Sequence, residues 1–118
     1  MATPNIVQVS SLTGRTNAAI ITTTVSTLLA NPISSNKLVK VTSLRVTNAD
    51  TTPSSVTFEL YRLGNSYPLV LNHVLNASSP TVLVTKDSAI YLEEGDEIRC
   101  NSNANVGLAA ICSFEVIA

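Results

Sequence analysis

Short runs of alternating apolar residues, each followed by a turn signal, constrain the fold of this chain more than any other feature of its sequence. In the clearest run, Val56, Phe58 and Leu60 alternate with Thr57 and Glu59, as in a strand with one buried face. Turn-forming residues recur at intervals of about 8 to 12 positions, which is typical of sandwiches and barrels. The chain also holds 13 Val, 8 Ile and 14 Thr, whose β-branched side chains favour strands. We therefore predict an all-β fold, a single antiparallel β-sandwich that is jelly-roll-like and has about eight to ten short strands.

The longest predicted strand, residues 37–48, changes phase in its apolar pattern. Val39 and Val41 occupy odd positions, whereas Leu44 and Val46 occupy even ones. Successive side chains of a strand point to opposite faces. The change therefore predicts a bulge, or a strand that passes from one sheet to the other.

Residues 18–30 are compatible with two kinds of secondary structure. Ile21, Val25 and Leu28 are spaced as on one face of a helix, whereas the threonines at 22–24 favour strands. We predict two short strands here, with a helix as the alternative.

We expect one domain, residues 1–118, because the chain has no internal repeat and no linker and is long enough to bury a core. Residues 1–12 are predicted to include an extended N-terminal arm. The arm is apolar at Ile6, Val7 and Val9, and these residues are candidates for an assembly interface. The arm either packs on its own domain or docks on a neighbour, and the sequence is compatible with both.

Charge is sparse and nearly balanced, with 7 Lys and Arg, 8 Asp and Glu, and a net charge of −1. The basic residues are scattered rather than clustered, so no nucleic-acid partner is expected. No apolar run approaches the roughly 20 residues of a membrane helix, and the start lacks a charged region followed by an apolar run. We therefore expect no membrane partner and synthesis in the cytoplasm. Thr, Ser and Asn supply 39 of the 118 residues, and an uncharged polar surface of this kind favours a protein that works within an assembly.

The two cysteines, Cys100 and Cys112, are too few for a disulfide scaffold or a four-thiolate zinc site. If residues 96–101 and 111–116 form an antiparallel hairpin, the two thiols face each other on the core side. Two buried free thiols and a cross-strand disulfide are both compatible with this arrangement. A reducing compartment favours the free thiols.

No catalytic constellation is evident in the sequence. His73 is the sole histidine, and Asp50, Asp87 and Asp96 leave a triad possible only in principle, because no nucleophile elbow accompanies them. His73 also lies in a predicted strand, where a structural role is the ordinary one. We expect a non-enzymatic protein that uses no cofactor.

An acidic turn precedes the last predicted hairpin, with Glu93, Glu94, Asp96 and Glu97 around Gly95. Carboxylates bind calcium in such loops, but the EF-hand pattern is absent. We interpret the segment as a solvated turn without a metal ion, in which Gly95 and Asp96 serve turn geometry.

Several segments together resemble a known group of proteins. They are the run from Ala89 to Arg99 (AIYLEEGDEIR), the terminal strand SFEVI at 113–117, the run NKLVKVTSLRVTN at 36–48, the strand VTFELY at 56–61, and the start NIV at 5–7. These segments resemble small β-sandwich structural proteins of tailed bacteriophage particles, including those of marine T4-like cyanophages. The resemblance implies a non-enzymatic virion component, commonly a symmetric oligomer, and carries no catalytic residues over. Gly95 and Asp96 match its motif.

The function expected from this resemblance is that of a capsid decoration (cement) protein, which acts by self-assembly and lattice binding. Its partners would be copies of itself, as a homo-oligomer, and other virion proteins such as the major capsid protein. It would be located in the virion after synthesis in the host cytoplasm. A neck, tail or baseplate component is the alternative within the same class. A receptor- or carbohydrate-binding module is the alternative of another class, and it would use a pocket lined by Tyr61, Tyr67 or Tyr91.

Overall fold

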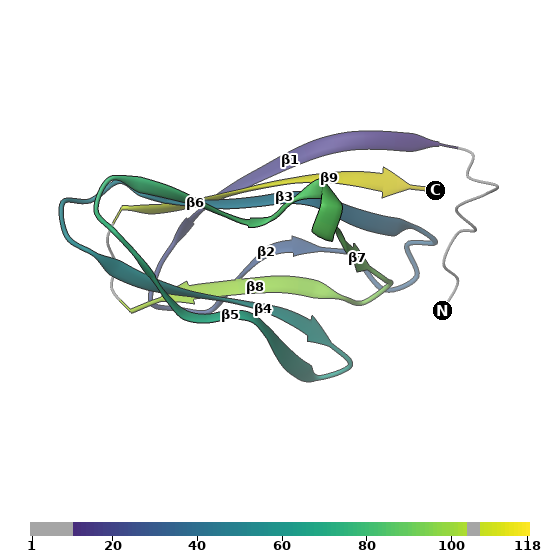
Figure 1. Cartoon of the computed structure of the whole chain (residues 1–118). Coiled ribbons are helices and arrows are strands. Elements are labelled where there is room, and N and C mark those ends of the chain that lie inside the picture. Colours follow the sequence, from purple (N-terminus) through teal and green to yellow (C-terminus); the bar gives the residue numbers. More distant parts are fainter. Residues whose placement is uncertain (1–10, 104–106) are drawn as a thin grey trace.

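The computed structural model describes residues 11–103 and 107–118 of the chain. Within these ranges the chain forms nine strands in two antiparallel sheets, which lie one above the other in Figure 1. The predicted all-β sandwich is therefore confirmed, and the number of strands falls within the expected range.

The two sheets are named A and B. Sheet A contains, in spatial order, β1 (Leu12–Ile21), β9 (Leu108–Ile117), β3 (Leu38–Asn48) and β6 (Ser79–Val84), and β7 (Ile90–Leu92) pairs with β3 along the same side as β6. Sheet B contains β2 (Ser26–Ala30), β8 (Glu97–Ser102), β4 (Ser54–Arg62) and β5 (Asn65–Leu75). A short 3-10 helix, η2 (Lys86–Ser88), lies between β6 and β7.

The strands pair as in a jelly roll, which is a long hairpin rolled into two sheets. β1 pairs with β9, β2 with β8, β3 with both β7 and β6, and β4 with β5, so the partners are nested around the β4–β5 hairpin. Rolling then places β9 beside β3 and β8 beside β4. Because β6 and β7 together act as one interrupted strand, the nine strands fill the eight positions of a jelly roll.

Apolar side chains of both sheets meet in one core. Val56 and Phe58 are 0 % exposed, as their alternation predicts, and Leu60 packs against the core at its margin. Full burial of side chains of this size stabilises the fold by about 1.5–3 kcal/mol each. The other buried members of the cluster are Ile21, Leu28, Leu29, Val39, Val41, Leu44, Val46, Leu75, Val84, Leu92, Ile98, Cys100, Leu108, Ala110, Cys112 and Phe114.

The phase change in β3 corresponds to a bulge. The register of β3 against β9 shifts between Val41 and Ser43, at the place where the apolar positions change from odd to even. The extra residue lets Val41 and Leu44 both face the core, where each is 0 % exposed. The strand itself remains in sheet A.

The ambiguous segment 18–30 forms strands and not a helix. β1 ends at Ile21 and β2 runs from Ser26 to Ala30, which confirms the prediction of two strands. β1 is longer than expected, since it begins at Leu12, inside the range assigned to the arm. Residues 1–10 of the predicted arm lie outside the described residues.

Several turns contain residues with positive φ, and the turns at Gly64 and Gly95 are two of them. Leu63 and Gly64 have φ of 52° and 80°, which is the pattern of the two-residue hairpin that joins β4 to β5. Gly95 has φ of 89° in the turn between β7 and β8, where a residue with a side chain would be strained.

The predicted hairpin of residues 96–101 and 111–116 is wrong. β8 pairs with β2 and β4 in sheet B, whereas β9 pairs with β1 and β3 in sheet A. The connection between them therefore crosses from one sheet to the other instead of closing a local hairpin. Cys100 and Cys112 consequently project from opposite sheets, and both are buried free thiols.

Candidate functional site

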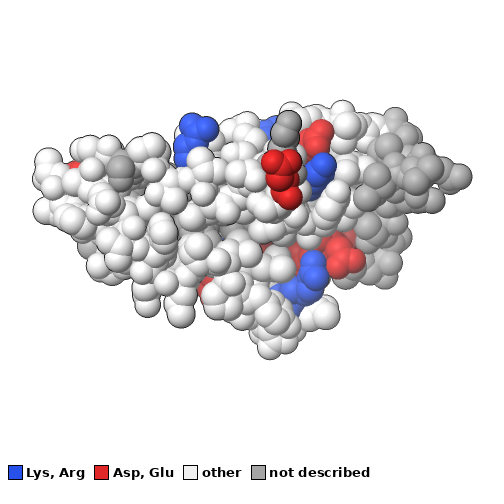
Figure 2. Space-filling model, viewed as in Figure 1, with Lys and Arg blue, Asp and Glu red and all other residues white. Residues whose placement is uncertain are grey.

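Charged residues are few in this chain, 7 Lys and Arg and 8 Asp and Glu. Lys, Arg, Asp and Glu cover only a small part of the face shown in Figure 2. Large apolar side chains are nonetheless exposed on strands of both sheets and in turns, namely Leu12, Ile20, Val25, Ile33, Leu63, Tyr67, Leu71, Val74, Val82, Tyr91 and Ile111. Such a surface is suited to protein–protein contacts that rely on shape and apolar area rather than on charge.

In the part of the chain that the structure describes, the two sheets end in four edge strands, and three of them carry features that hinder pairing with another chain. β2 has five residues and a register shift against β8. β6 has six residues, includes Pro80 and shifts register against β3. β5 includes Pro68, shifts register twice against β4, and has a left-handed residue at Asn72 with φ of 49°. Proline removes a backbone donor, and bulges twist an edge away from a straight partner.

The fourth edge, β1, has none of these features. Its ten residues pair with β9 in unbroken register, it contains no proline, and Arg15 is its one charged residue. Ser11 and Ala118, next to its start, donate backbone hydrogen bonds to each other at 3.0 Å. Because such pairs alternate along an antiparallel ladder, odd-numbered residues of β1 bond to β9, and even-numbered residues point their N–H and C=O groups away from it. Within the described part of the chain, no hydrogen bond reaches the outward backbone groups of Leu12, Gly14, Thr16, Ala18 and Ile20.

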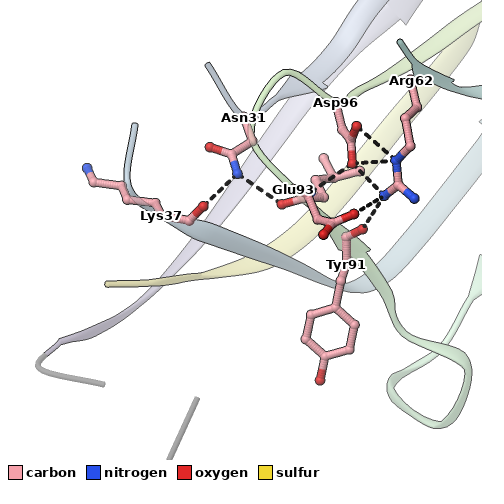
Figure 3. Close-up of polar contacts among 7 residues, drawn as sticks. Asn31, Lys37, Arg62, Tyr91, Glu93 and Asp96 are labelled. Atoms are coloured by element: carbon pink, nitrogen blue, oxygen red, sulfur yellow. Dashed lines mark hydrogen bonds and ion pairs between the residues drawn. The ribbon is translucent and has the colours of Figure 1, made fainter. Parts of the chain in front are cut away.

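A partly buried ion cluster joins the end of β4 to the turn between β7 and β8 (Figure 3). Arg62, the last residue of β4, donates from Nε to both carboxylate oxygens of Asp96 at 3.0 Å and from Nη2 to Oδ2 at 2.5 Å. Its Nη2 also lies 3.3 Å from Glu93 Oε2. Oδ2 of Asp96 accepts the backbone N–H of Glu93 at 2.8 Å, which closes the turn. The hydrogen bonds to Asp96 are the main cause of the raised pKa of Arg62, which therefore stays charged.

Asn31 joins this turn to the preceding β2–β3 connection. Its amide Nδ2 donates to the carbonyls of Lys37 and Leu92, each at 2.9 Å. Its backbone N–H donates to the Asp96 carbonyl at 2.9 Å, and its carbonyl accepts the N–H of Gly95 at 2.7 Å. Asn31 is 1 % exposed, so one amide side chain holds three segments together at this end of the molecule.

The acidic turn is therefore not the solvated loop that we expected. Glu94 and Asp96 are only 3 % and 2 % exposed. Their burial is compatible with charge because Asp96 is paired with Arg62, and Oε2 of Glu94 accepts the backbone N–H of Asn36 at 3.2 Å. The positive φ of Gly95 and the bond from Asp96 to the Glu93 N–H are the turn-geometry features expected of these two residues. The burial was missed because Arg62 is distant in the sequence, and no local signal pairs it with Asp96.

A pocket of about 410 Å³ opens beside this cluster. It is lined by Ile33, Tyr61, Leu63, Gly64, Glu94, Gly95, Asp96 and Glu97. Ile33 and Leu63 are more than four-fifths exposed, so the pocket has apolar side chains at its rim. Its carboxylates already have partners within the chain. The pocket is therefore mainly an apolar depression, because its carboxylates are bonded within the chain.

Glu97, Arg99 and Tyr61 form a second polar group, of which Glu97 and Tyr61 line the pocket. The Thr27 hydroxyl donates to Glu97 Oε1 at 2.7 Å, and Arg99 Nε donates to the same oxygen at 3.2 Å. The hydrogen bond from Thr27, and then that from Arg99, lowers the pKa of Glu97. The Arg99 guanidinium lies 3.5 Å from the centre of the Tyr61 ring. One face of Tyr61 is thus occupied, while Tyr67 and Tyr91 do not line this pocket.

The two thiols are buried in the core, and the histidine lies on a strand of sheet B. Burial raises the pKa of the Cys112 thiol to about 11, and burial is also the main cause of the raised pKa of Cys100. Neither thiol is therefore a thiolate nucleophile at neutral pH. His73 lies in β5 opposite Val56, and its imidazole has no hydrogen bond or ion pair with the residues that the structure describes.

Ile6, Val7 and Val9, the assembly candidates of the arm, lie outside the described residues. In residues 11–103 and 107–118, no group of three or more His, Cys, Asp or Glu side chains is arranged to hold a metal ion, and no helix has the length and apolarity to cross a bilayer. Comparisons with protein-family models and with curated protein sequences found no match to the chain.

Proposed function

We propose that this chain is a non-enzymatic structural protein of a virus particle, and that it decorates the capsid by self-assembly and lattice binding. The observation that carries the proposal is the open edge of β1, a ten-residue strand whose outward backbone groups have no hydrogen bond within residues 11–103 and 107–118. Globular proteins ordinarily protect such an edge, because it recruits strands from other chains. Here the other three edges are protected and this one is not, which favours a protein that joins other chains through β1.

The sparse charge and the jelly-roll topology support the same function. Contacts repeated over a lattice are individually weak, and exposed apolar side chains on a surface with few charges suit them. Jelly rolls serve in viral shells as well as in lectins, so the topology is an analogy and does not choose between functions. A neck, tail or baseplate component would use the same edge, and it is the alternative position in the particle.

Mass spectrometry of gradient-purified particles from the culture that produces the chain tests this function. We expect the chain in the particle fraction, in a fixed ratio to the most abundant shell protein. Separating heads from tails before the measurement distinguishes the two positions. Decoration predicts recovery with heads, and a neck or tail role predicts recovery with tails. A chain found only in the soluble fraction would overturn the proposal.

The arm is expected to add to the same contacts through Ile6, Val7 and Val9. Deletion of residues 2–10 should weaken rebinding of the purified chain to particles from which it has been stripped. The full-length chain is the control in the same sedimentation assay. Unchanged rebinding would remove the arm from the assembly surface while leaving the role of β1 in place.

A further inference from the structure

We infer that β1 pairs with β1 of a second copy of this chain, antiparallel and about a two-fold axis, so that the A sheets of the two copies form one continuous sheet. The inference deepens the proposed assembly role and rests on it, because it names the partner and the register of the open edge.

The outward backbone groups of β1 are complementary to themselves. Leu12, Gly14, Thr16, Ala18 and Ile20 each present one donor and one acceptor on the side away from β9. In an antiparallel ladder, residues with outward groups face each other and exchange two hydrogen bonds per pair. A second copy of β1 therefore supplies a matching partner for every one of these groups.

One register satisfies all five outward residues at once. It places Thr16 opposite Thr16 of the second copy, on the two-fold axis, with Gly14 opposite Ala18 and Leu12 opposite Ile20. The five pairs with two bonds each make ten hydrogen bonds across the axis. A shift of the second strand by two residues in either direction leaves one outward residue of each copy beyond the end of the ladder.

The same register brings together the two exposed apolar side chains of the strand. Leu12 and Ile20 are 59 % and 68 % exposed, and both lie on the face of β1 opposite to the buried Ile21. Cross-strand pairing places each Leu12 against Ile20 of the other copy, at both ends of the interface. Arg15, the one charge of the strand, faces Asn17 of the second copy, so no like charges meet.

Analytical ultracentrifugation of the full-length chain tests the pairing. We expect a dimer of twice the 12.5 kDa chain mass. Thr16→Pro removes a backbone N–H that points away from β9, so it spares the ladder within the chain but deletes two hydrogen bonds at the axis. The dimer dissociation constant should rise by at least about tenfold, since each such bond stabilises by about 1 kcal/mol.

Thr16→Val is the matched control for this variant. Both substitutions lose the contact of the Thr16 hydroxyl with Ser113, which measures 3.2 Å, but only proline loses the backbone donor. We expect Thr16→Val to dimerise like the natural chain. Far-UV circular dichroism establishes that both variants retain the strand content of the natural chain.

A pair of complementary charges introduced at Leu12 and Ile20 tests the register without using proline. Ile20→Lys should weaken the dimer at least about tenfold, because it places an ammonium against Leu12 of the other copy. Adding Leu12→Glu should restore dimerisation, because a carboxylate then faces that ammonium across the axis. Within one chain the two positions are eight residues apart, about 26 Å along a strand, so restoration cannot arise inside a monomer.

A monomeric natural chain, a Thr16→Pro variant that associates like Thr16→Val, or a double variant that stays as weak as Ile20→Lys would each overturn the inference. These outcomes are independent of the particle measurement. A chain that is present in particles but monomeric in solution overturns β1 pairing and leaves the proposed function standing. A chain that dimerises through β1 but is absent from particles does the reverse.

Discussion

Replacing Asp96 by Asn should destabilise the fold strongly, because it leaves Arg62 without its charged partner. The side chain of Asp96 is 3 % exposed and that of Arg62 is 33 % exposed. Removing one partner of a fully buried ion pair costs about 3–5 kcal/mol. One-third of Arg62 remains in water, and Glu93 lies 3.3 Å from its Nη2, so we expect a smaller loss, about 2–3 kcal/mol.

Urea unfolding followed by circular dichroism measures this loss. With a urea dependence of about 1–3 kcal/mol/M, the midpoint should fall by roughly 1–2 M for Asp96→Asn. Asp87→Asn is the control, since it removes an equal charge from an exposed position on η2. It should change the free energy of unfolding by less than about 0.5 kcal/mol.

A double-mutant cycle identifies the cause of the loss. If the unpaired guanidinium is responsible, Arg62→Gln in the Asp96→Asn background should cost clearly less than it does in the natural chain. A coupling of about 1–2 kcal/mol between the two positions is expected. Equal midpoints for the Asp96 and Asp87 variants, or strictly additive effects in the cycle, would refute the argument that this ion cluster stabilises the fold.

Three further predictions concern other parts of the chain. The hydrogen bond from the Thr27 hydroxyl lowers the pKa of Glu97 below its ordinary value of 4.5. The bond therefore stabilises the fold at pH values above 4.5, and this stabilisation is lost as the pH falls through the lowered pKa. The urea midpoints of Thr27→Val and the natural chain should therefore differ at neutral pH and converge in acid, and a gap of constant size would contradict this. Gly95→Ala should lower the free energy of unfolding by about 1 kcal/mol, because φ is 89° at this position. Gly14→Ala should leave the free energy of unfolding unchanged or raise it slightly, because no atom lies within 4 Å of the added Cβ. Equal effects of the two substitutions in thermal unfolding would count against this interpretation. Cys112, whose pKa is raised to about 11, should resist alkylation by iodoacetamide at neutral pH until urea unfolds the chain, as read by mass spectrometry, and rapid labelling of the folded protein would show that the thiol is accessible.

Local features of the sequence determined the strand class and much of the strand pattern. The alternation at Val56 and Phe58 predicted buried positions, and the change of parity between Val41 and Leu44 predicted the bulge in β3. Gly95 predicted a turn, and it lies in one with φ of 89°. These features are readable because side-chain alternation and φ preferences act within a few residues, whatever the rest of the chain does.

The choice of strand partners was decided by the tertiary structure alone. β8 and β9 are neighbours in the sequence and were predicted to pair, yet they lie in different sheets. Nothing within residues 96–117 distinguishes a local hairpin from a connection between sheets, because both bury the same alternating side chains. In the jelly roll, strands pair with strands that are far away in the sequence, as β9 does with β1 and β3. These long-range pairings cannot be predicted from a short segment.

The features that support the proposed function could not be predicted from local sequence either. Asp96 of the acidic turn is buried in an ion pair only because Arg62, 34 positions away, ends β4 beside it. The open edge of β1 likewise depends on the assembled sheet, because a strand is an edge only when no other strand of the sheet pairs with its second side. Composition and alternation determined that the chain forms pleated sheets with little charge. Only the packing of distant strands determined which charges are buried and which backbone groups remain open to another chain, because those outcomes depend on contacts between residues far apart in sequence.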